Sequence, residues 1–312
     1  MEPDRWLGVE LRHLAALEAV AGEGTFGRAA EKLGYTQSAV SQQIATLERI
    51  VGERLVERPG GPRPVTLTEA GRVLLRHAEA IVARLKAAQA DLSALAGGEA
   101  GSLRVGTFQS VGAKVLPEVL KRFRRSWPAV EIELRESHLS RELAAGVERG
   151  ELDVAFVELP LDAEAASLEA IELLRDEYVL VTAADSPFGA GRRPSLRELA
   201  AQPLIGYRHC QATEVVVGQL RATGREPHFV FRSDENGVVQ GLAAAGIGVA
   251  IVPRLAVDEN DEAVRIVELG MKIAPRIVGI ARHRDRYHSA AARAFVETAL
   301  EVGSEAGRSL AA

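Results

Sequence analysis

The chain has 312 residues, of which 47% are hydrophobic and 26% are charged. This length exceeds what one hydrophobic core usually holds, so we expect a multidomain protein with two or three domains. The net charge of −5 and the sequence pI of about 5.9 exclude a general attraction to nucleic acid or to anionic membranes.

Export and disulfide bonding are not expected. The N-terminal segment MEPDRWLGVELRHL has charges where a signal peptide needs an apolar run. The longest uncharged stretch, residues 236–253, contains Asn236, Gln240 and several glycines, which favours a buried helix, turn and strand over a membrane span. The one cysteine, Cys210, fits a reducing compartment. We therefore expect a cytoplasmic protein with no membrane partner.

Residues 5–66 predict a small helical domain. Apolar periodicity indicates helices at residues 11–21, 25–33 and 37–51, with a turn at Gly34-Tyr35 and Thr36 as the N-cap of the third helix. Two short helices joined by a tight turn that contains glycine are typical of a helix-turn-helix. The piece RPGGPRPV at residues 58–65 is too rich in helix breakers for a helix or a central strand, and it predicts a wing along a phosphate backbone.

The third helix has an unusual polar face. Val40, Ile44 and Leu47 make one side apolar, whereas the opposite side has no charge before Glu48. A helix in the major groove needs uncharged donors and acceptors that match base edges, and Gln and Ser provide them. The alternative is an exposed polar helix without a partner, which we consider weaker because the preceding helix and turn also fit. The predicted DNA-binding residues are Thr36, Gln37, Ser38, Ser41, Gln42, Arg49, Arg58 and Arg63.

The charge of this head is low for a DNA-binding domain. Residues 1–66 contain eight Lys or Arg and nine Asp or Glu, although such domains are normally basic. We therefore expect a modest salt dependence for each head and an affinity that depends on several heads binding together.

Residues 67–97 predict one long helix, which Thr68 caps and Gly97-Gly98 ends. Its apolar residues follow the spacing of a heptad seam. In one interpretation the seam packs against the chain's own lobes. In the favoured one, two such helices pair and hold two heads at a fixed spacing. The seam residues are Leu74, Ile81, Leu85, Ala88, Leu92 and Leu95.

Residues 101–300 predict an α/β domain, because strand-like runs alternate with helices. The order strand, helix, strand occurs at residues 130–160 and again at 228–253, and the helices end at Gly150 and Gly246. Two α/β lobes with a cleft between them are the simplest construction. Residues 301–312 are expected to form a C-terminal tail.

A ligand site is expected where helices begin after strands, at Ser110, Ser140 and Thr213. Open α/β sheets bind ligands at the carboxyl ends of their strands, and helix N-termini favour anions. The prediction is a small carboxylate or another small anion; the alternative is that each hydroxyl only caps its own helix. The candidate effector-binding residues are Thr107, Gln109, Ser110, Ser140, Arg208, His209 and Thr213.

Catalysis, a cofactor and a metal are not expected. No Ser/His/Asp arrangement is evident, and the segment Gly246 to Gly248 lacks the context of a dinucleotide loop. His283 and His288 have no evident third ligand, which favours a solvated turn. Cys210 has no second cysteine to resolve an oxidised form, which favours a pocket-lining or core residue.

Residues 11–71 resemble the winged helix-turn-helix head of LysR-type transcriptional regulators. The matching positions are Ala29-Ala30, Gln37, Ala39-Val40-Ser41, Leu47-Glu48, Glu57-Arg58, Leu67-Thr68 and Ala70-Gly71. Ser38 stands where proline is common, Gln42 where a basic residue is common, and Val56 where phenylalanine is usual.

Residues 102–300 resemble the effector-binding domain of the same family, which is built like a periplasmic binding protein, through the segments RVGT, GELDVAF and GLAAAGIGVAIVPR. The resemblance implies a winged helix-turn-helix head, a linker helix that dimerises, and a two-lobed effector domain. It implies a non-enzymatic activator or repressor that binds double-stranded DNA as a homodimer or homotetramer and responds to a small-molecule effector. The alternative function is a two-lobed small-molecule-binding protein without a role in transcription.

Overall fold

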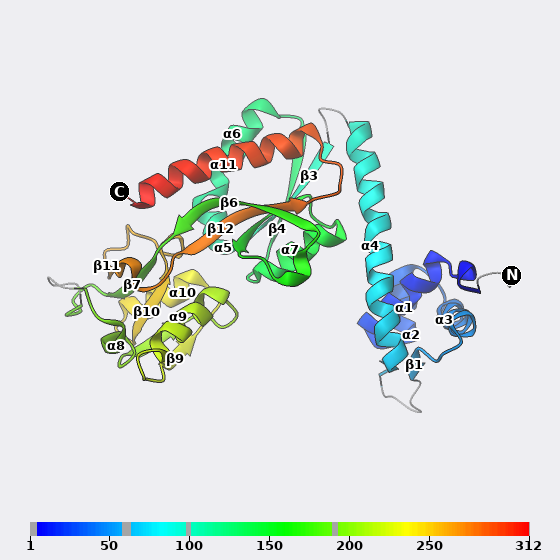
Figure 1. The fold of residues 1–312 in the computed structure, drawn as a ribbon, viewed down its shortest axis with the longest axis horizontal. Helices are drawn as coiled ribbons and strands as arrows, with labels where there is room; N and C mark the ends of the chain where they lie inside the picture. Colours follow the sequence, from blue (N-terminus) through cyan, green and yellow to red (C-terminus); the bar gives the residue numbers. More distant parts are fainter. Residues whose placement is uncertain (1–4, 58–63, 98–100, 189–192, 312) are drawn as a thin grey trace. The chain divides into compact units, whose positions relative to one another are not determined.

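The computed structural model describes residues 5–57, 64–97, 101–188 and 193–311 (Figure 1). The chain divides into two compact units, residues 1–90 and residues 91–312, and each is described by itself. The expected class of fold is confirmed: a helical head with a long linker helix is followed by an α/β domain with two sheets.

The head is built from α1 (Leu11–Glu23), α2 (Phe26–Leu33) and α3 (Gln37–Val51), after a 3-10 turn at Arg5–Gly8. The hydroxyls of Thr25 and Thr36 accept the N–H groups of Arg28 and Ala39 and so cap α2 and α3. Gly34 ends α2 with φ of 70°, a left-handed conformation that favours glycine, and so turns the chain into α3.

A short antiparallel ribbon, β1 (Val56–Glu57) and β2 (Thr66–Leu67), flanks the Gly/Pro-rich piece. The predicted wing falls mostly on residues 58–63, which lie outside the described residues, as do Arg58 and Arg63.

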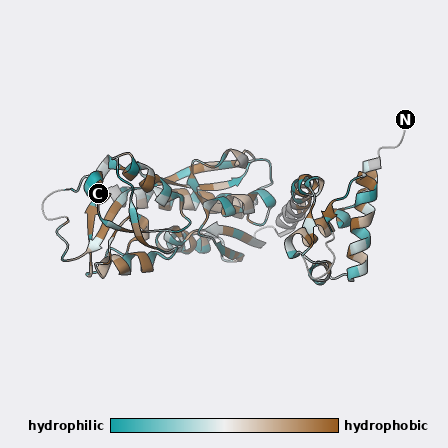
Figure 2. Cartoon of the chain, turned by 90° about the horizontal axis from the view of Figure 1, so that it is seen from below, coloured by the Kyte–Doolittle hydropathy of each residue, from teal (hydrophilic) through white to brown (hydrophobic). Residues whose placement is uncertain are grey.

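The first part of α4 (Glu69–Gly97) completes the core of the head. The hydroxyl of Thr68 accepts the N–H of Gly71 at 3.0 Å, so Thr68 caps this helix as predicted. Ala78 is fully buried, and Leu74 packs against the same core. Leu74 therefore does not belong to the open seam. Figure 2 shows brown and teal segments alternating along the helices of this unit, as an inward apolar face requires.

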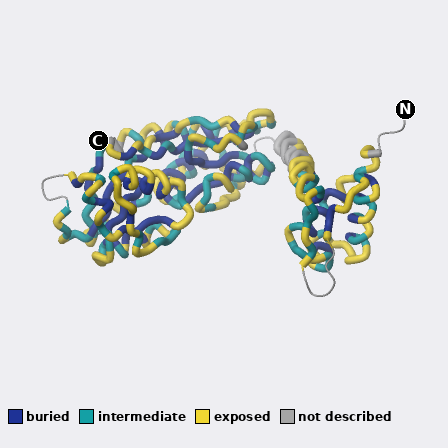
Figure 3. The backbone as a smooth tube through the Cα atoms, turned by 60° about the horizontal axis from the view of Figure 1, so that its bottom comes forward, coloured by how far each residue is buried: buried dark blue, intermediate teal, exposed yellow. Residues whose placement is uncertain are grey.

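The remaining described seam residues are exposed in the single chain. Ile81, Leu85 and Leu92 have exposed fractions of 48%, 53% and 68%, and Ala88 is exposed as well. Figure 3 shows the described part of this stretch mostly in yellow. The side chain of Leu95 lies outside the described part of the chain. A row of exposed leucine and isoleucine side chains is costly in water, and the described core of the head does not cover it.

The α/β unit contains two sheets with the same strand order. Lobe I has the order β4-β3-β5-β12-β6, and lobe II has the order β9-β8-β10-β7-β11. In lobe I, β12 is antiparallel to both of its neighbours, and in lobe II β7 is the corresponding antiparallel strand. The strands are β3 (Gly101–Thr107), β4 (Val130–Glu136), β5 (Val154–Leu159), β6 (Leu168–Asp176), β7 (Tyr178–Ala183), β8 (Pro203–Gly206), β9 (His228–Arg232), β10 (Val249–Pro253), β11 (Val264–Glu268) and β12 (Arg276–His283).

The internal repeat is confirmed as β4-α7-β5 in lobe I and β9-α10-β10 in lobe II, with α7 at Ser140–Arg149 and α10 at Asn236–Ala244. Gly150 and Gly246 follow these helices with φ of 76° and 71°. The chain passes from lobe I to lobe II at Glu177, between β6 and β7, and returns between β11 and β12. Each sheet therefore combines strands from distant parts of the sequence.

The other helices cover these sheets: α5 (Gln109–Lys114), α6 (Leu116–Ser126), α8 (Leu196–Leu199), α9 (Gln211–Arg221) and α11 (Ala290–Ala311). Figure 1 shows α11, in red, lying along lobe I. No helix among the described residues has the length and hydropathy that crossing a bilayer requires.

The prediction of a separate tail at residues 301–312 is wrong, because α11 continues through residue 311. Val302 is buried, and Gly303 lies so close to β6 that an added Cβ would be 2.4 Å from Cγ of Leu173. Glu305 also pairs with Arg122 of α6 at 2.6 Å. Residues 301–305 therefore belong to lobe I, because their side chains complete its packing.

Candidate functional site

The polar face of α3 is open to solvent. Gln37, Ser38 and Gln42 are exposed and Ser41 is half-buried, whereas Val40 on the opposite side is fully buried. Thr36 and Arg49, at the two ends of the predicted contact surface, are also exposed. The uncharged amides and hydroxyls are thus not used for packing within the head, and they remain available to base edges.

A hydrogen-bonded joint connects α3 to the ribbon and to α4. Oε1 of Glu48 accepts the N–H groups of Leu55 and Val56 at 2.9 and 3.3 Å. The carbonyl of Leu55 in turn accepts the N–H of Thr68 at 3.0 Å. The ribbon is therefore hydrogen-bonded both to α3, through the carboxylate of Glu48, and to the residue that caps α4.

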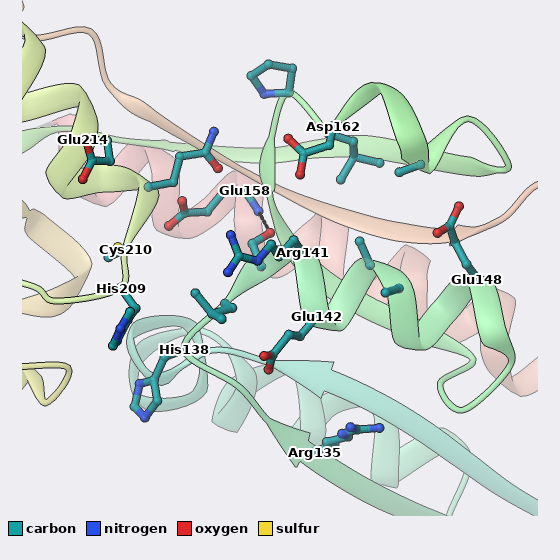
Figure 4. A pocket seen from close by; sticks show the side chains of 18 of the residues that line it. Arg135, His138, Arg141, Glu142, Glu148, Glu158, Asp162, His209, Cys210 and Glu214 are labelled. Carbon is teal, nitrogen blue, oxygen red and sulfur yellow. Dashed lines mark hydrogen bonds between the residues drawn. The ribbon is translucent and has the colours of Figure 1, made fainter. Parts of the chain in front are cut away.

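The α/β unit has a cleft of about 980 Å³ between its lobes (Figure 4). Lobe I contributes the end of β4, α7 and the segment after β5, and lobe II contributes the segment after β8 and the first turn of α9. The charged lining is of both signs, so this cleft is not a simple cationic site. The charged and histidine side chains that line it are Arg135, His138, Arg141, Glu142, Glu148, Arg149, Glu158, Asp162, Arg208, His209 and Glu214.

A smaller cavity of about 40 Å³ adjoins the cleft and shares Ser140, Glu158, His209 and Cys210 with it. Phe108 and Tyr207 form aromatic walls, and Gln109 and Asn236 add polar groups. The smaller cavity therefore combines a few polar groups with aromatic rings.

The predicted effector-binding residues separate into three groups. Ser140, Arg208 and His209 line the cleft, and Gln109 and Ser110 line the smaller cavity. Thr107 and Thr213 line neither. The buried Thr107 hydroxyl donates to the carbonyl of Phe108 at 3.4 Å, and the Thr213 hydroxyl accepts the N–H of Tyr207 at 3.2 Å.

The three helix-start hydroxyls do not cap their own helices. The residues at the cap positions of α5, α7 and α9 are Phe108, Leu139 and Cys210, and none of them makes a side-chain cap. Ser110 accepts a hydrogen bond from Arg276, and Ser140 accepts the N–H of Glu158 at 2.8 Å. These hydroxyls therefore tie helices to strands.

Gln109 connects the two lobes. Its Nε2 donates to Glu235 at 2.7 Å, and its Oε1 accepts the N–H of Asn236, at the start of α10, at 2.9 Å. Because α5 belongs to lobe I and α10 to lobe II, these two bonds cross the interlobe gap. In this structure the side chain of Gln109 hydrogen-bonds lobe I to lobe II.

A buried ionic cluster at the lobe crossing was not anticipated from the sequence. Arg276, at the start of β12, is 9% exposed and bonds Glu158, Asp176 and Ser110. Phe108 lies 5.2 Å from its guanidinium carbon. Burial alone would lower the pKa of Arg276, but the charges of Asp176 and Glu158 outweigh it and raise that pKa. Asp176, the last residue of β6 in lobe I, also accepts the N–H of Leu255, which follows β10 of lobe II. The cluster therefore joins both lobes.

Cys210 lines both cavities, as the sequence interpretation favoured. Burial raises the pKa of its thiol to about 11. The thiol is therefore almost wholly protonated at neutral pH, which disfavours attack on an oxidant.

The described residues contain no cluster of three or more His, Cys, Asp or Glu side chains that could hold a metal ion. His283 is nevertheless not in a solvated turn: it is the buried last residue of β12, and its Nδ1 accepts the N–H of Asp285 at 3.1 Å.

Known proteins match both units. A family model described as "Bacterial regulatory helix-turn-helix protein, lysR family" matches residues 11–72, and one described as "LysR substrate binding domain" matches residues 96–304. A probable RuBisCO transcriptional regulator of Cyanophora paradoxa is 30% identical over 309 residues, covering 96% of this chain and 93% of the relative. The HTH-type transcriptional regulator AlsR of Bacillus subtilis (strain 168) is 32% identical and covers 80% of this chain and 82% of the relative.

Among solved structures, full-length CbnR complexed with its target DNA aligns with a TM-score of 0.63 at 24% identity. The alignment covers 94% of this chain and 100% of that chain. This likeness concerns the fold alone, and it extends over nearly the whole chain.

Proposed function

The chain belongs to the LysR family of transcriptional regulators, and from this premise we propose that it reads operator DNA as a homodimer or homotetramer under the control of a small carboxylate or other small anion. It is a regulator and not an enzyme, in keeping with the names of its relatives. We propose that it acts in the cytoplasm, where it binds double-stranded DNA.

The exposed uncharged face of α3 supports this proposal most. Gln37, Ser38 and Gln42 present donors and acceptors to solvent, and no acidic side chain on this helix precedes Glu48. Carboxylates in the first turns would be repelled by phosphates. A two-lobed binding protein without a role in transcription would have no use for such a surface.

The effector is proposed to act on the angle between the lobes. Gln109 and the Arg276 cluster join the lobes on one side of the cleft, so a ligand bound to both walls would stabilise one lobe arrangement. An effector shifts the equilibrium only by binding the two arrangements unequally. In the oligomer, the shifted arrangement would change the spacing of the heads or the bend of the DNA.

Gln37→Ala tests base reading. We expect it to cost about 1–3 kcal/mol of discrimination at one base position, because a bidentate amide contact would be lost. The measurement is a gel shift or fluorescence anisotropy with DNA from upstream of the chain's own gene and a set of single-base variants of that site.

Two further variants serve as comparisons for this test. Arg49 is a predicted DNA-binding residue for which we propose a phosphate contact, so Arg49→Ala is expected to weaken binding to all sequences alike and to reduce the salt slope by about 1. Gln219→Ala, an exposed glutamine on α9, should change nothing. Equal weakening of all sequences by Gln37→Ala would contradict base reading by Gln37.

A double substitution, Ile81→Asp with Leu85→Asp, tests the proposed pairing of linker helices. Buried carboxylates would break the seam, so we expect monomers and a loss of about 10²-fold in operator affinity, because the second head no longer binds intramolecularly. Sedimentation velocity and anisotropy measure the two effects. Ala80→Asp adds the same charge on another face of α4 and should leave the dimer intact. A double variant that remains dimeric would exclude this seam as the interface.

A further inference from the structure

Six charged side chains of the cleft form no ion pair among the described residues, and four of these also make no hydrogen bond to another side chain. Lobe I contributes Arg141 on α7 and Asp162 after β5, and lobe II contributes Arg208 after β8 and Glu214 on α9. All four are exposed. The one guanidinium contact of Arg208 is a bond of 3.4 Å from Nη2 to the carbonyl of Arg232. Each lobe therefore offers one cation and one anion that bond no other side chain.

Most other charged groups of the cleft are already occupied. Arg135 and Arg149 pair with Glu151, which lies outside the lining. Glu158 pairs with Arg276, and His209 with Asp234. Glu142 and Glu148 accept hydrogen bonds from Ser137 and Ser167. Glu142 and Glu148 thus have hydrogen-bond donors but no cation, whereas the two cations and two anions named first bond no other side chain and form a distinct subset of the lining.

A ligand with a single charge fits this subset poorly. A carboxylate drawn to Arg141 and Arg208 would share a cavity of about 980 Å³ with Asp162 and Glu214, which repel it. A simple amine would be attracted by the two carboxylates but repelled by the two arginines. Charges within a concave site are screened less than charges on a convex surface. Both the attraction by the arginines and the repulsion by the carboxylates therefore affect a bound carboxylate.

The two carboxylates of this subset lie away from Arg141. In Figure 4, Arg141 extends from α7 into the middle of the cleft, near Glu158 and Glu142, whereas Glu214 and Asp162 lie apart from each other along the upper part of the view. The first turn of α7, which carries Arg141, has no side-chain cap, and helix N-termini favour a carboxylate over an ammonium. Arg141 and the two carboxylates of the subset therefore offer different positions in the cleft to the two ends of a ligand.

We propose that the effector is a dipolar molecule, a free amino acid or a short peptide, whose carboxylate binds between Arg141 and Arg208 and whose ammonium binds Asp162 and Glu214. This inference rests on the proposed function and narrows its effector from a small anion to an ampholyte. Because each lobe supplies one partner for each end of the ligand, binding favours the arrangement in which both lobes touch it.

The first test compares matched ligands on the full chain by isothermal titration calorimetry. The panel contains the proteinogenic amino acids and glycyl dipeptides, each beside its desamino carboxylate and its decarboxylated amine; for leucine these are 4-methylpentanoate and isoamylamine. We expect at least one dipolar member to bind, and both of its single-charge analogues to bind more weakly by at least about tenfold.

The outcomes separate the inference from the proposed function. If the desamino carboxylate binds as tightly as its amino acid, the dipolar inference is wrong while a carboxylate effector still stands. If no member binds, both the ampholyte and the carboxylate effector are rejected, and DNA reading by α3 is judged independently by the Gln37 variants.

The second test uses neutral variants with the ligand that binds. Glu214→Gln should remove most of the preference for the amino acid over its desamino analogue, and Arg141→Gln should weaken both ligands alike. Arg124→Gln, an exposed arginine on α6 outside the cleft, is the control and should leave both affinities unchanged. If Glu214→Gln leaves the preference intact, these side chains only solvate the cleft or pair with each other when the lobes close.

Discussion

Arg276→Met is expected to lower the free energy of unfolding of the α/β unit by about 3–5 kcal/mol. The substitution keeps much of the side-chain volume but leaves Asp176, which is fully buried, and Glu158 without their cation. A buried carboxylate without a counter-charge is far more costly than a missing hydrogen bond between neutral groups.

Urea unfolding of the full chain can isolate this effect, because the two tryptophans lie in different units. In a Trp6→Phe background, Trp127 reports on the α/β unit alone. The matched control is Arg282→Met on the same strand, whose pair with Glu169 is partly exposed and should contribute less than about 1 kcal/mol. Adding Asp176→Asn and Glu158→Gln to Arg276→Met should restore part of the loss. Equal losses in Arg276→Met and Arg282→Met would contradict the argument.

Gly71→Ala is expected to destabilise the head by about 3 kcal/mol, the upper part of the usual range for overpacking. An added Cβ at Gly71 would lie 2.0 Å from the carbonyl oxygen of Leu55, which is a backbone atom and not the end of a flexible side chain. The same carbonyl accepts the N–H of Thr68, so relief of the clash would break the joint between α4 and the ribbon.

The head is followed by Trp6 fluorescence in a Trp127→Phe background. Gly22→Ala is the control: Gly22 lies in α1 with no atom within 4 Å of an added Cβ, so alanine should be neutral or stabilise by about 0.4–1 kcal/mol. The two Gly→Ala changes are thus expected to have opposite signs. A Gly71→Ala protein as stable as the parent would show that α4 can shift without cost.

The head was predictable because its information is local. The period of apolar residues, Thr36 as a cap and Gly34 as a turn gave α3 at residues 37–51, and the structure has the same bounds. The order of elements in the repeat was likewise visible, since Gly150 and Gly246 both end helices in the left-handed conformation. The burial of Leu74 could not be predicted, because a heptad pattern does not reveal which of its residues packs against a neighbouring core.

The site was only partly predictable, since its contacts join distant residues. Gln109 contacts Asn236, and Arg276 contacts Glu158 and Asp176, across a hundred or more positions of sequence. Nothing near Arg276 in the sequence distinguishes it from the many surface arginines. Thr107 and Thr213 were plausible because they end a strand and begin a helix, but both hydroxyls point to their own backbone neighbourhood.

The strand order of lobe I has a consequence for synthesis on the ribosome. In its sheet β5 and β6 both pair with β12, so they wait for residues 276–283, whereas the head's buried core is complete once residue 78 has emerged. At about 5–20 residues per second, this delay is on the order of ten seconds or more. During that time a folded head would precede a nascent lobe whose central strand β5 has one open edge, which is exposed to pairing with other strands.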